Sequence, residues 1–173
     1  MIQFLYKNCI IGETIMDKNL IKTIIIESQE KKLPWLIERD INIDTKTNKI
    51  IAITGPRRSG KTYLLYQIMK ELLKQKVQPN QILYINIDDP RLLPMDSKGI
   101  ELIYESFKEL YPDYNKRINY IFFDEIQNVK DWEIGIRRLY DTKNFKIFLT
   151  GSSSKLLSKE IATQLRGINK ATR

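Results

Sequence analysis

The chain contains no histidine and only one cysteine, Cys9, among its 173 residues. The absence of histidine excludes Ser-His-Asp and Cys-His nucleophile systems, histidine general bases and zinc sites that depend on imidazole. A single cysteine cannot form an intrachain disulfide or a thiolate cluster, and an unpaired thiol is typical of a reducing compartment. We therefore expect a cytoplasmic protein whose chemistry rests on other side chains.

The chain also lacks any uninterrupted apolar run near the ~20 residues that a membrane helix needs, so we expect no membrane-spanning segment. Lysine and arginine number 29 against 21 aspartate and glutamate, which gives a net charge of +8. This surplus favours an anionic partner such as a nucleotide, a nucleic acid or an acidic surface, without choosing among them. The 42% hydrophobic and 29% charged residues are typical of a globular domain.

The first fifteen residues do not form a convincing signal peptide, because Lys7 and Asn8 interrupt the apolar positions and no small-residue cleavage site follows. A second methionine, Met16, stands directly before the first clear helical pattern. We expect residues 1–16 to be an N-terminal extension. Either translation starts at Met16, or the extension is frayed or packed at the edge of the domain.

Hydrophobic spacing after this extension predicts helices that alternate with strands. We expect helices over residues 17–32, 64–76, 99–111, 132–140 and 154–166, and strands over 50–53, 82–87, 120–123 and 145–149. Asp17 is the expected N-cap of the first helix. Such alternation predicts an α/β fold, in which a parallel sheet is covered by helices on both faces.

The segment between the first strand and the second helix matches the phosphate-loop pattern G-x-x-x-x-G-K-[S/T]. It reads Gly55-Pro56-Arg57-Arg58-Ser59-Gly60-Lys61-Thr62. Its glycines let the backbone wrap closely round a phosphate, while successive N–H groups and the helix N-terminus supply positive potential. Lys61 would reach the β and γ phosphates of a nucleotide, and Thr62 would place its hydroxyl on Mg²⁺. We predict that all eight residues bind a nucleotide; the alternative is an ordinary glycine-containing turn.

The third predicted strand ends in two acidic residues, Asp124 and Glu125. In open α/β sheets, ligands bind at this carboxyl edge, beside the loop that follows the first strand. Asp124 is predicted to hold Mg²⁺ directly or through water, and Glu125 to accept a proton from a water aimed at the γ phosphate. Small-molecule kinases of the phosphate-loop superfamily usually lack such a glutamate, so Glu125 favours hydrolysis. The alternative is that Asp124 caps the following helix.

Polar residues end the second and fourth strands at the same edge. Thr150 is a candidate to contact the γ phosphate or to position the attacking water, although one of the serines at 152–154 would serve equally well as the cap of the last helix. Asp88 and Asp89 precede Pro90. The simpler interpretation of these two residues is turn initiation; contact with a Mg²⁺-bound water, a partner chain or a remote substrate is the other.

Together these motifs resemble the archaeal and bacterial AAA-type ATPase family whose members carry a further carboxyl-terminal domain. The resemblance covers residues 17–167, and besides the phosphate loop it rests on segments 88–92, 123–127 and 150–157 and on Trp132. It implies a three-layer α/β/α P-loop NTPase fold of the additional-strand type, with sheet order 5-1-4-3-2. It also implies that the protein binds ATP with Mg²⁺ and hydrolyses it.

The resemblance implies that the sequence is an amino-terminal piece, because it stops before the fifth strand, the lid and the second domain of the family. Residues 168–173 would then be a truncated tail. Without strand five, strand one would lie at an exposed sheet edge, where self-association or pairing with a partner chain is expected.

One departure from the family leaves other functions open. Members carry a Leu-x-Gly-Arg element, whereas this sequence reads Leu165-Arg166-Gly167-Ile168, so the arginine that would serve as a finger is replaced. One alternative is therefore a nucleotide-binding module with little or no hydrolysis. A second is a nucleic-acid-dependent ATPase, suggested by the net charge and by the doublets Arg57-Arg58 and Arg137-Arg138, although the basic residues are scattered among acids.

Overall fold

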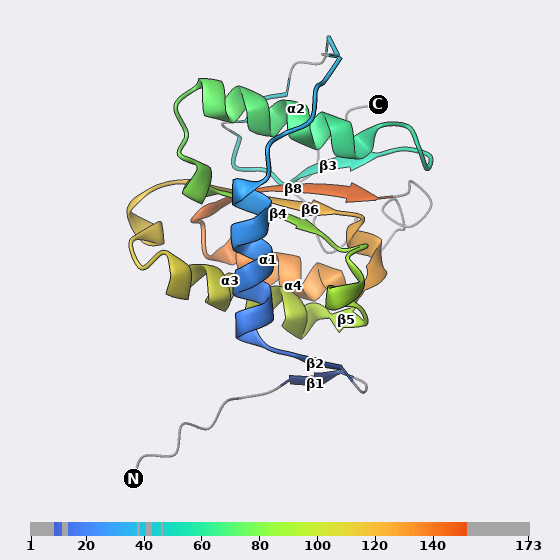
Figure 1. Ribbon diagram of the computed structural model, residues 1–173, viewed down its shortest axis with the longest axis vertical. Helices are drawn as coiled ribbons and strands as arrows, with labels where there is room; N and C mark the ends of the chain where they lie inside the picture. Colours follow the sequence, from blue (N-terminus) through green and yellow to red (C-terminus); the bar gives the residue numbers. More distant parts are fainter. Residues whose placement is uncertain (1–8, 12–13, 38, 41–42, 46, 152–173) are drawn as a thin grey trace.

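Four parallel strands form the centre of the computed structural model, which describes residues 9–11, 14–37, 39–40, 43–45 and 47–151 (Figure 1). They are β3 (Ile51–Thr54), β4 (Ile82–Asn86), β6 (Asn119–Asp124) and β8 (Phe145–Gly151). Their order in the sheet is β3-β8-β6-β4, and every pairing is parallel. Counted along the chain this is 1-4-3-2, which confirms the implied order for these four strands. Within the described residues this sheet has no fifth strand.

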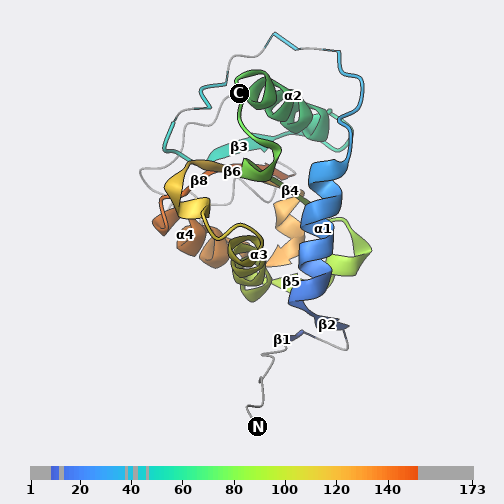
Figure 2. The ribbon, with the colours of Figure 1, turned by 60° about the vertical axis from the view of Figure 1, so that its left-hand side comes forward.

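Helices cover both faces of this sheet (Figures 1 and 2). They are α1 (Lys18–Glu30), α2 (Lys61–Lys74), α3 (Ser97–Leu110) and α4 (Trp132–Asp141). Helix α2 packs on one face, α3 and α4 pack on the other, and α1 lies against α3 and the edge strand β4. The arrangement is the predicted three-layer α/β/α sandwich of the P-loop NTPase type.

Local signals in the sequence account for these elements. Asp17 is the N-cap of α1, since the backbone N–H of Leu20 donates to its carboxylate over 2.7 Å. Alternation along β6 sends Phe122 toward α2 and Phe123 toward the opposite core. Phe122 stacks on Phe148 of β8, with ring centroids 4.6 Å apart and planes 12° apart. This aromatic pair therefore joins the two central strands to the α2 layer.

Four short strands and four 3₁₀ turns were not predicted. The strands are β1 (Cys9–Ile11), β2 (Thr14–Met16), β5 (Met95–Asp96) and β7 (Val129–Lys130), and the turns are η1 (Pro79–Gln81), η2 (Pro90–Leu92), η3 (Tyr114–Lys116) and η4 (Ile126–Asn128). Strands of two or three residues are too short to show a periodic pattern. The antiparallel β1–β2 hairpin lies in the segment expected to be an extension, and Met16 at its end is buried.

Some predictions concern residues outside the described part of the chain. The helix over 154–166, the serines at 152–154 and the Leu165–Ile168 departure all lie there. None of the helices in the described ranges combines the length and the apolar character that a membrane-spanning helix requires.

The Phe122–Phe148 stack allows a test of the core under α2. Phe122→Ala is expected to lower the free energy of unfolding by about 3–5 kcal/mol, because it leaves a cavity between the sheet and α2. Urea denaturation measures the loss. Trp35→Ala is the matched aromatic control: Trp35 is 81% exposed, so its loss should stay within about 0.5 kcal/mol. Equal losses in the two variants would contradict this core.

Candidate nucleotide-binding site

The predicted phosphate loop, residues 55–62, joins β3 to the first turn of α2. Gly60 has φ +85°, and Arg58 also lies in the left-handed region with φ 62°. A Cβ at Gly55 would come within 2.9 Å of Ser59 Oγ, so a larger residue there would crowd the loop. Gly60 thus occurs where the backbone adopts a left-handed conformation, and Gly55 where a side chain would meet Ser59.

The Lys61 side chain turns into this loop and is only 6% exposed. Its Nζ donates to Gly55 O and Pro56 O, each over 3.2 Å, and lies 3.3 Å from Glu125 Oε1. The ammonium group therefore links the loop after β3 to the acidic end of β6.

The Asp124 carboxylate is 2% exposed and has a hydroxyl donor on each oxygen. Tyr84 OH donates to Oδ2 over 2.9 Å, and Thr150 Oγ1 donates to Oδ1. Thr150 Oγ1 in turn accepts from the backbone N–H of Glu125 over 2.9 Å. Hydrogen bonds to this one carboxylate thus join three adjacent strands, β4, β6 and β8. The alternative that Asp124 caps the following helix is wrong, since Glu125 stands at the N-cap of η4.

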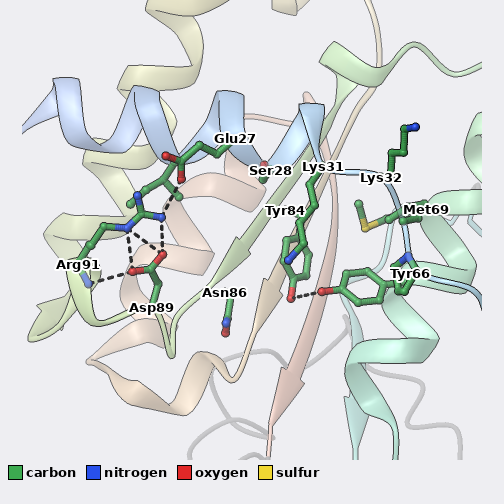
Figure 3. A pocket seen from close by; sticks show the side chains of 13 residues that line it. Glu27, Ser28, Lys31, Lys32, Tyr66, Met69, Tyr84, Asn86, Asp89 and Arg91 are labelled. Atoms are coloured by element: carbon green, nitrogen blue, oxygen red, sulfur yellow. Dashed lines mark hydrogen bonds and ion pairs between the residues drawn. The ribbon is translucent and has the colours of Figure 1, made fainter.

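Tyr84 was not expected to contribute to the site. Burial, and then the nearby Asp124 carboxylate, raise the pKa of the Tyr84 phenol far above its usual range, so it stays a neutral donor. Tyr66 of α2 donates to Tyr84 OH over 3.4 Å, and Figure 3 shows the two hydroxyls pointing toward each other. Both rings line a cavity of about 190 Å³ beside the end of α1. Asp124 is thus connected to helix α2 through the hydroxyl groups of Tyr84 and Tyr66.

Glu125 sits in a left-handed turn, with φ 58°, that aims its side chain back toward the loop. Besides the contact with Lys61, its Oε2 accepts from Gln127 Nε2 over 2.7 Å. Glu125 also lines an open hollow of about 460 Å³ together with Arg57 and Arg58. The Glu125 carboxylate therefore lies among the cationic side chains that could also bind a polyphosphate.

The remaining predicted residues lie around this centre. Thr62 is half-buried in the first turn of α2. Asp89 caps η2 by accepting from Arg91 N over 3.0 Å and pairs with the Arg91 guanidinium, which lowers the pKa of its carboxyl; this is the turn role predicted for it. Asp88 accepts from Asn128 Nδ2. Asp89 therefore stabilises the turn after β4, and Asp88 joins that turn to η4.

Sequence reasoning missed four side chains at or near the site: Tyr66, Tyr84, Gln127 and Arg39. Arg39 donates through Nη2 to Ser59 O over 2.9 Å. Gln127 belongs to segment 123–127 of the family resemblance, although that segment predicted no role for it, and the other three belong to no motif. The roles of all four follow only from strand register and loop packing. The strand order, which brings β4 beside β6, is the one signal that would have placed Tyr84 near Asp124.

A family profile described as AAA domain matches residues 47–173, which is most of the chain and includes every residue of the site described above except Arg39. The chain belongs to the AAA domain family. An uncharacterised protein of Methanocaldococcus jannaschii is 42% identical over 163 residues, covering 94% of this chain and 34% of that protein. An uncharacterised protein of Haemophilus influenzae is 36% identical over 121 residues, covering 70% and 30%.

The chain spans about a third of the length of the curated relatives it matches. Among solved structures, that of PCH-2 from C. elegans covers 85% of this chain and 38% of that chain, at 20% identity and a TM-score of 0.47. Family membership makes this AAA domain a nucleotide-binding module of the ATPase type.

Thr150 offers a test of the hydrogen bonds at the centre of the AAA domain. Thr150→Val keeps the side-chain shape but leaves Asp124 Oδ1 and the Glu125 N–H without this hydroxyl, so we expect a loss of about 1–3 kcal/mol in unfolding free energy. Thr150→Ser retains the hydroxyl and should lose less. Chemical denaturation of both variants measures the difference; a serine variant less stable than the valine variant would show that the methyl group matters more.

Proposed function

We propose that this AAA domain binds ATP with Mg²⁺ and hydrolyses it. The observation that carries the proposal is the position of Lys61. Among the described residues, this buried ammonium contacts two loop carbonyls and one carboxylate, at distances of 3.2–3.3 Å, inside a glycine-bearing loop at the start of a helix. Phosphate oxygens are stronger partners for an ammonium than neutral carbonyls, so Lys61 is placed to exchange the carbonyls for a nucleotide.

The residues present fit a magnesium ion. Mg²⁺ usually binds one or two protein oxygens and completes its shell with water and substrate phosphates. Thr62 would supply a hydroxyl and Asp124 a carboxylate, directly or through a water molecule, while no cluster of three or more acidic or thiol ligands occurs in the part of the chain that the structure describes. The donor set therefore suits an ion that arrives with its nucleotide, where it would neutralise phosphate charge.

Glu125 would act as the general base. In the structure its two oxygens face Lys61 and Gln127. When Lys61 exchanges its present partners for phosphate oxygens, the Glu125 carboxylate loses an ion-pair partner while Gln127 still orients it. The free carboxylate oxygen can then accept a proton from a water molecule directed at the terminal phosphate.

A nucleotide-binding module without hydrolysis is the second candidate. The observation that favours it is the Lys61–Glu125 contact itself. If this contact persisted with nucleotide bound, Glu125 would be paired with Lys61 and could not act as the base.

A nucleic-acid partner has less support. Arg57 and Arg58 line the open hollow beside Glu125. Arg137 and Arg138 pair with the acidic residues Asp141 and Glu101, so the two doublets do not form one basic surface with unpaired charges.

Substitution of Lys61 and Glu125 separates binding from hydrolysis. Lys61→Ala should weaken Mg²⁺-ATP binding by about tenfold or more and abolish hydrolysis, because the loop loses its buried charge. Glu125→Gln should retain affinity within about twofold while turnover falls by about 10²–10⁴. Calorimetric binding and phosphate release are measured on the same samples.

Arg138→Ala, which removes an exposed charge on α4, is the control for both variants. Equal losses of affinity in the two site variants would contradict the role of Glu125. Binding by the unsubstituted chain without turnover would favour the non-hydrolysing module, and absence of binding would overturn the proposal.

The Tyr84 hydroxyl offers a test of the metal site. Tyr84→Phe removes the donor on Asp124 Oδ2, so the magnesium concentration for half-maximal ATP binding should rise by about tenfold. Tyr66→Phe removes only the 3.4 Å bond one step further away and should change it by less than about twofold. A magnesium titration of both variants decides; equal shifts would mean that the tyrosines act on packing and not through Asp124.

A further inference from the structure

We infer that Arg39 is a positioning residue of the phosphate loop, supplied by the segment that connects α1 to β3. Its Nη2 donates to Ser59 O over 2.9 Å. The same nitrogen lies 2.2 Å from the point where a Cβ on Gly60 would sit, so the guanidinium packs directly on the loop backbone. The inference rests on the proposed function, because a positioned loop matters only for a bound phosphate.

The backbone of Arg39 is anchored to α2. Gln67 Nε2 donates to Arg39 O over 2.8 Å, and Arg39 N donates to Gln67 Oε1 over 3.0 Å. The two bonds together hold the Arg39 backbone against the Gln67 side-chain amide. Positions 60 and 67 lie two turns apart and therefore on the same face of the helix. Arg39 thus spans the first two turns of α2, with its backbone at one end and its guanidinium at the other.

The anchored guanidinium fixes the peptide unit between Ser59 and Gly60. In a planar trans peptide the carbonyl and the N–H point in opposite directions. Because Arg39 binds the Ser59 carbonyl, the N–H of Gly60 points away from Arg39. The peptide unit cannot flip while this hydrogen bond is present. This restraint is needed here because Gly60, at φ +85°, has no side chain that limits rotation of the peptide.

The loop carbonyls are thereby shared between two cations. Lys61 holds Gly55 O and Pro56 O from within, and Arg39 holds Ser59 O. When Lys61 binds a phosphate instead, the hydrogen bond from Arg39 to Ser59 O does not have to change. Arg39 would keep the turn into α2 in place while the nucleotide enters, which lowers the cost of ordering the loop on binding.

The test compares two variants, each of which removes one of the two contacts of Arg39: the bond to Ser59 O or the bonds to Gln67. Arg39→Ala removes the guanidinium, and Gln67→Leu removes the anchor while the charge of Arg39 stays. We expect each to weaken Mg²⁺-ATP binding by about five- to tenfold. Arg39→Lys, which can still donate to a carbonyl, should recover part of the affinity. Arg138→Ala and Gln75→Leu, at exposed positions on α4 and at the end of α2, are the matched controls.

Amide hydrogen exchange of the nucleotide-free chain supplies a second measurement. Exchange at residues 57–62 should be faster in Arg39→Ala and Gln67→Leu than in the unsubstituted chain, with the melting temperature unchanged. Unchanged exchange in both variants would overturn the inference, as would weaker binding in Arg39→Ala alone, since that result indicates a charge effect. If the unsubstituted chain bound no nucleotide, the proposed function would fail, and the exchange data would still decide whether Arg39 holds the loop.

Discussion

The buried Asp124 carboxylate is the constraint on which the site depends. An ionised carboxylate without partners would cost several kcal/mol at this depth, so both of its oxygens must be satisfied. Tyr84 from β4 and Thr150 from β8 provide the two hydroxyls, and Thr150 also receives the N–H of Glu125. Three strands must keep their register for these bonds to form together. The acidic edge is therefore specified by the sheet and not by a flexible loop.

The ion pair between Lys61 and Glu125 couples the phosphate loop to this edge. Lys61 belongs to α2, Glu125 follows β6, and their charged atoms lie 3.3 Å apart. Helix α2 is held over the sheet by the core that contains the Phe122–Phe148 stack. The same packing that covers one face of the sheet thus brings the cation of the loop to the carboxylate of the neighbouring strand, which is where a nucleotide phosphate would need both.

Much of this architecture follows from local sequence. Apolar runs ending in Asp124 and Thr150 indicated the strands and their polar edge, and the glycine-lysine motif indicated the loop before α2. The short strands β5 and β7 left no pattern, because two residues cannot show alternation. Tyr84 and the Arg39–Gln67 pair could not be predicted for a different reason. Their partners lie 40 and 28 residues away, and the contacts exist only once strand order and loop path are known.

The central claim is that Lys61 is held in the place that a nucleotide phosphate takes over. A crystal structure of the chain with Mg²⁺ and a non-hydrolysable ATP analogue tests it most directly. The account predicts that Lys61 Nζ leaves Gly55 O and Pro56 O for phosphate oxygens, with Mg²⁺ beside Thr62 and Asp124. A nucleotide bound elsewhere, or one bound at the loop while Lys61 keeps its carbonyl partners, would contradict the account.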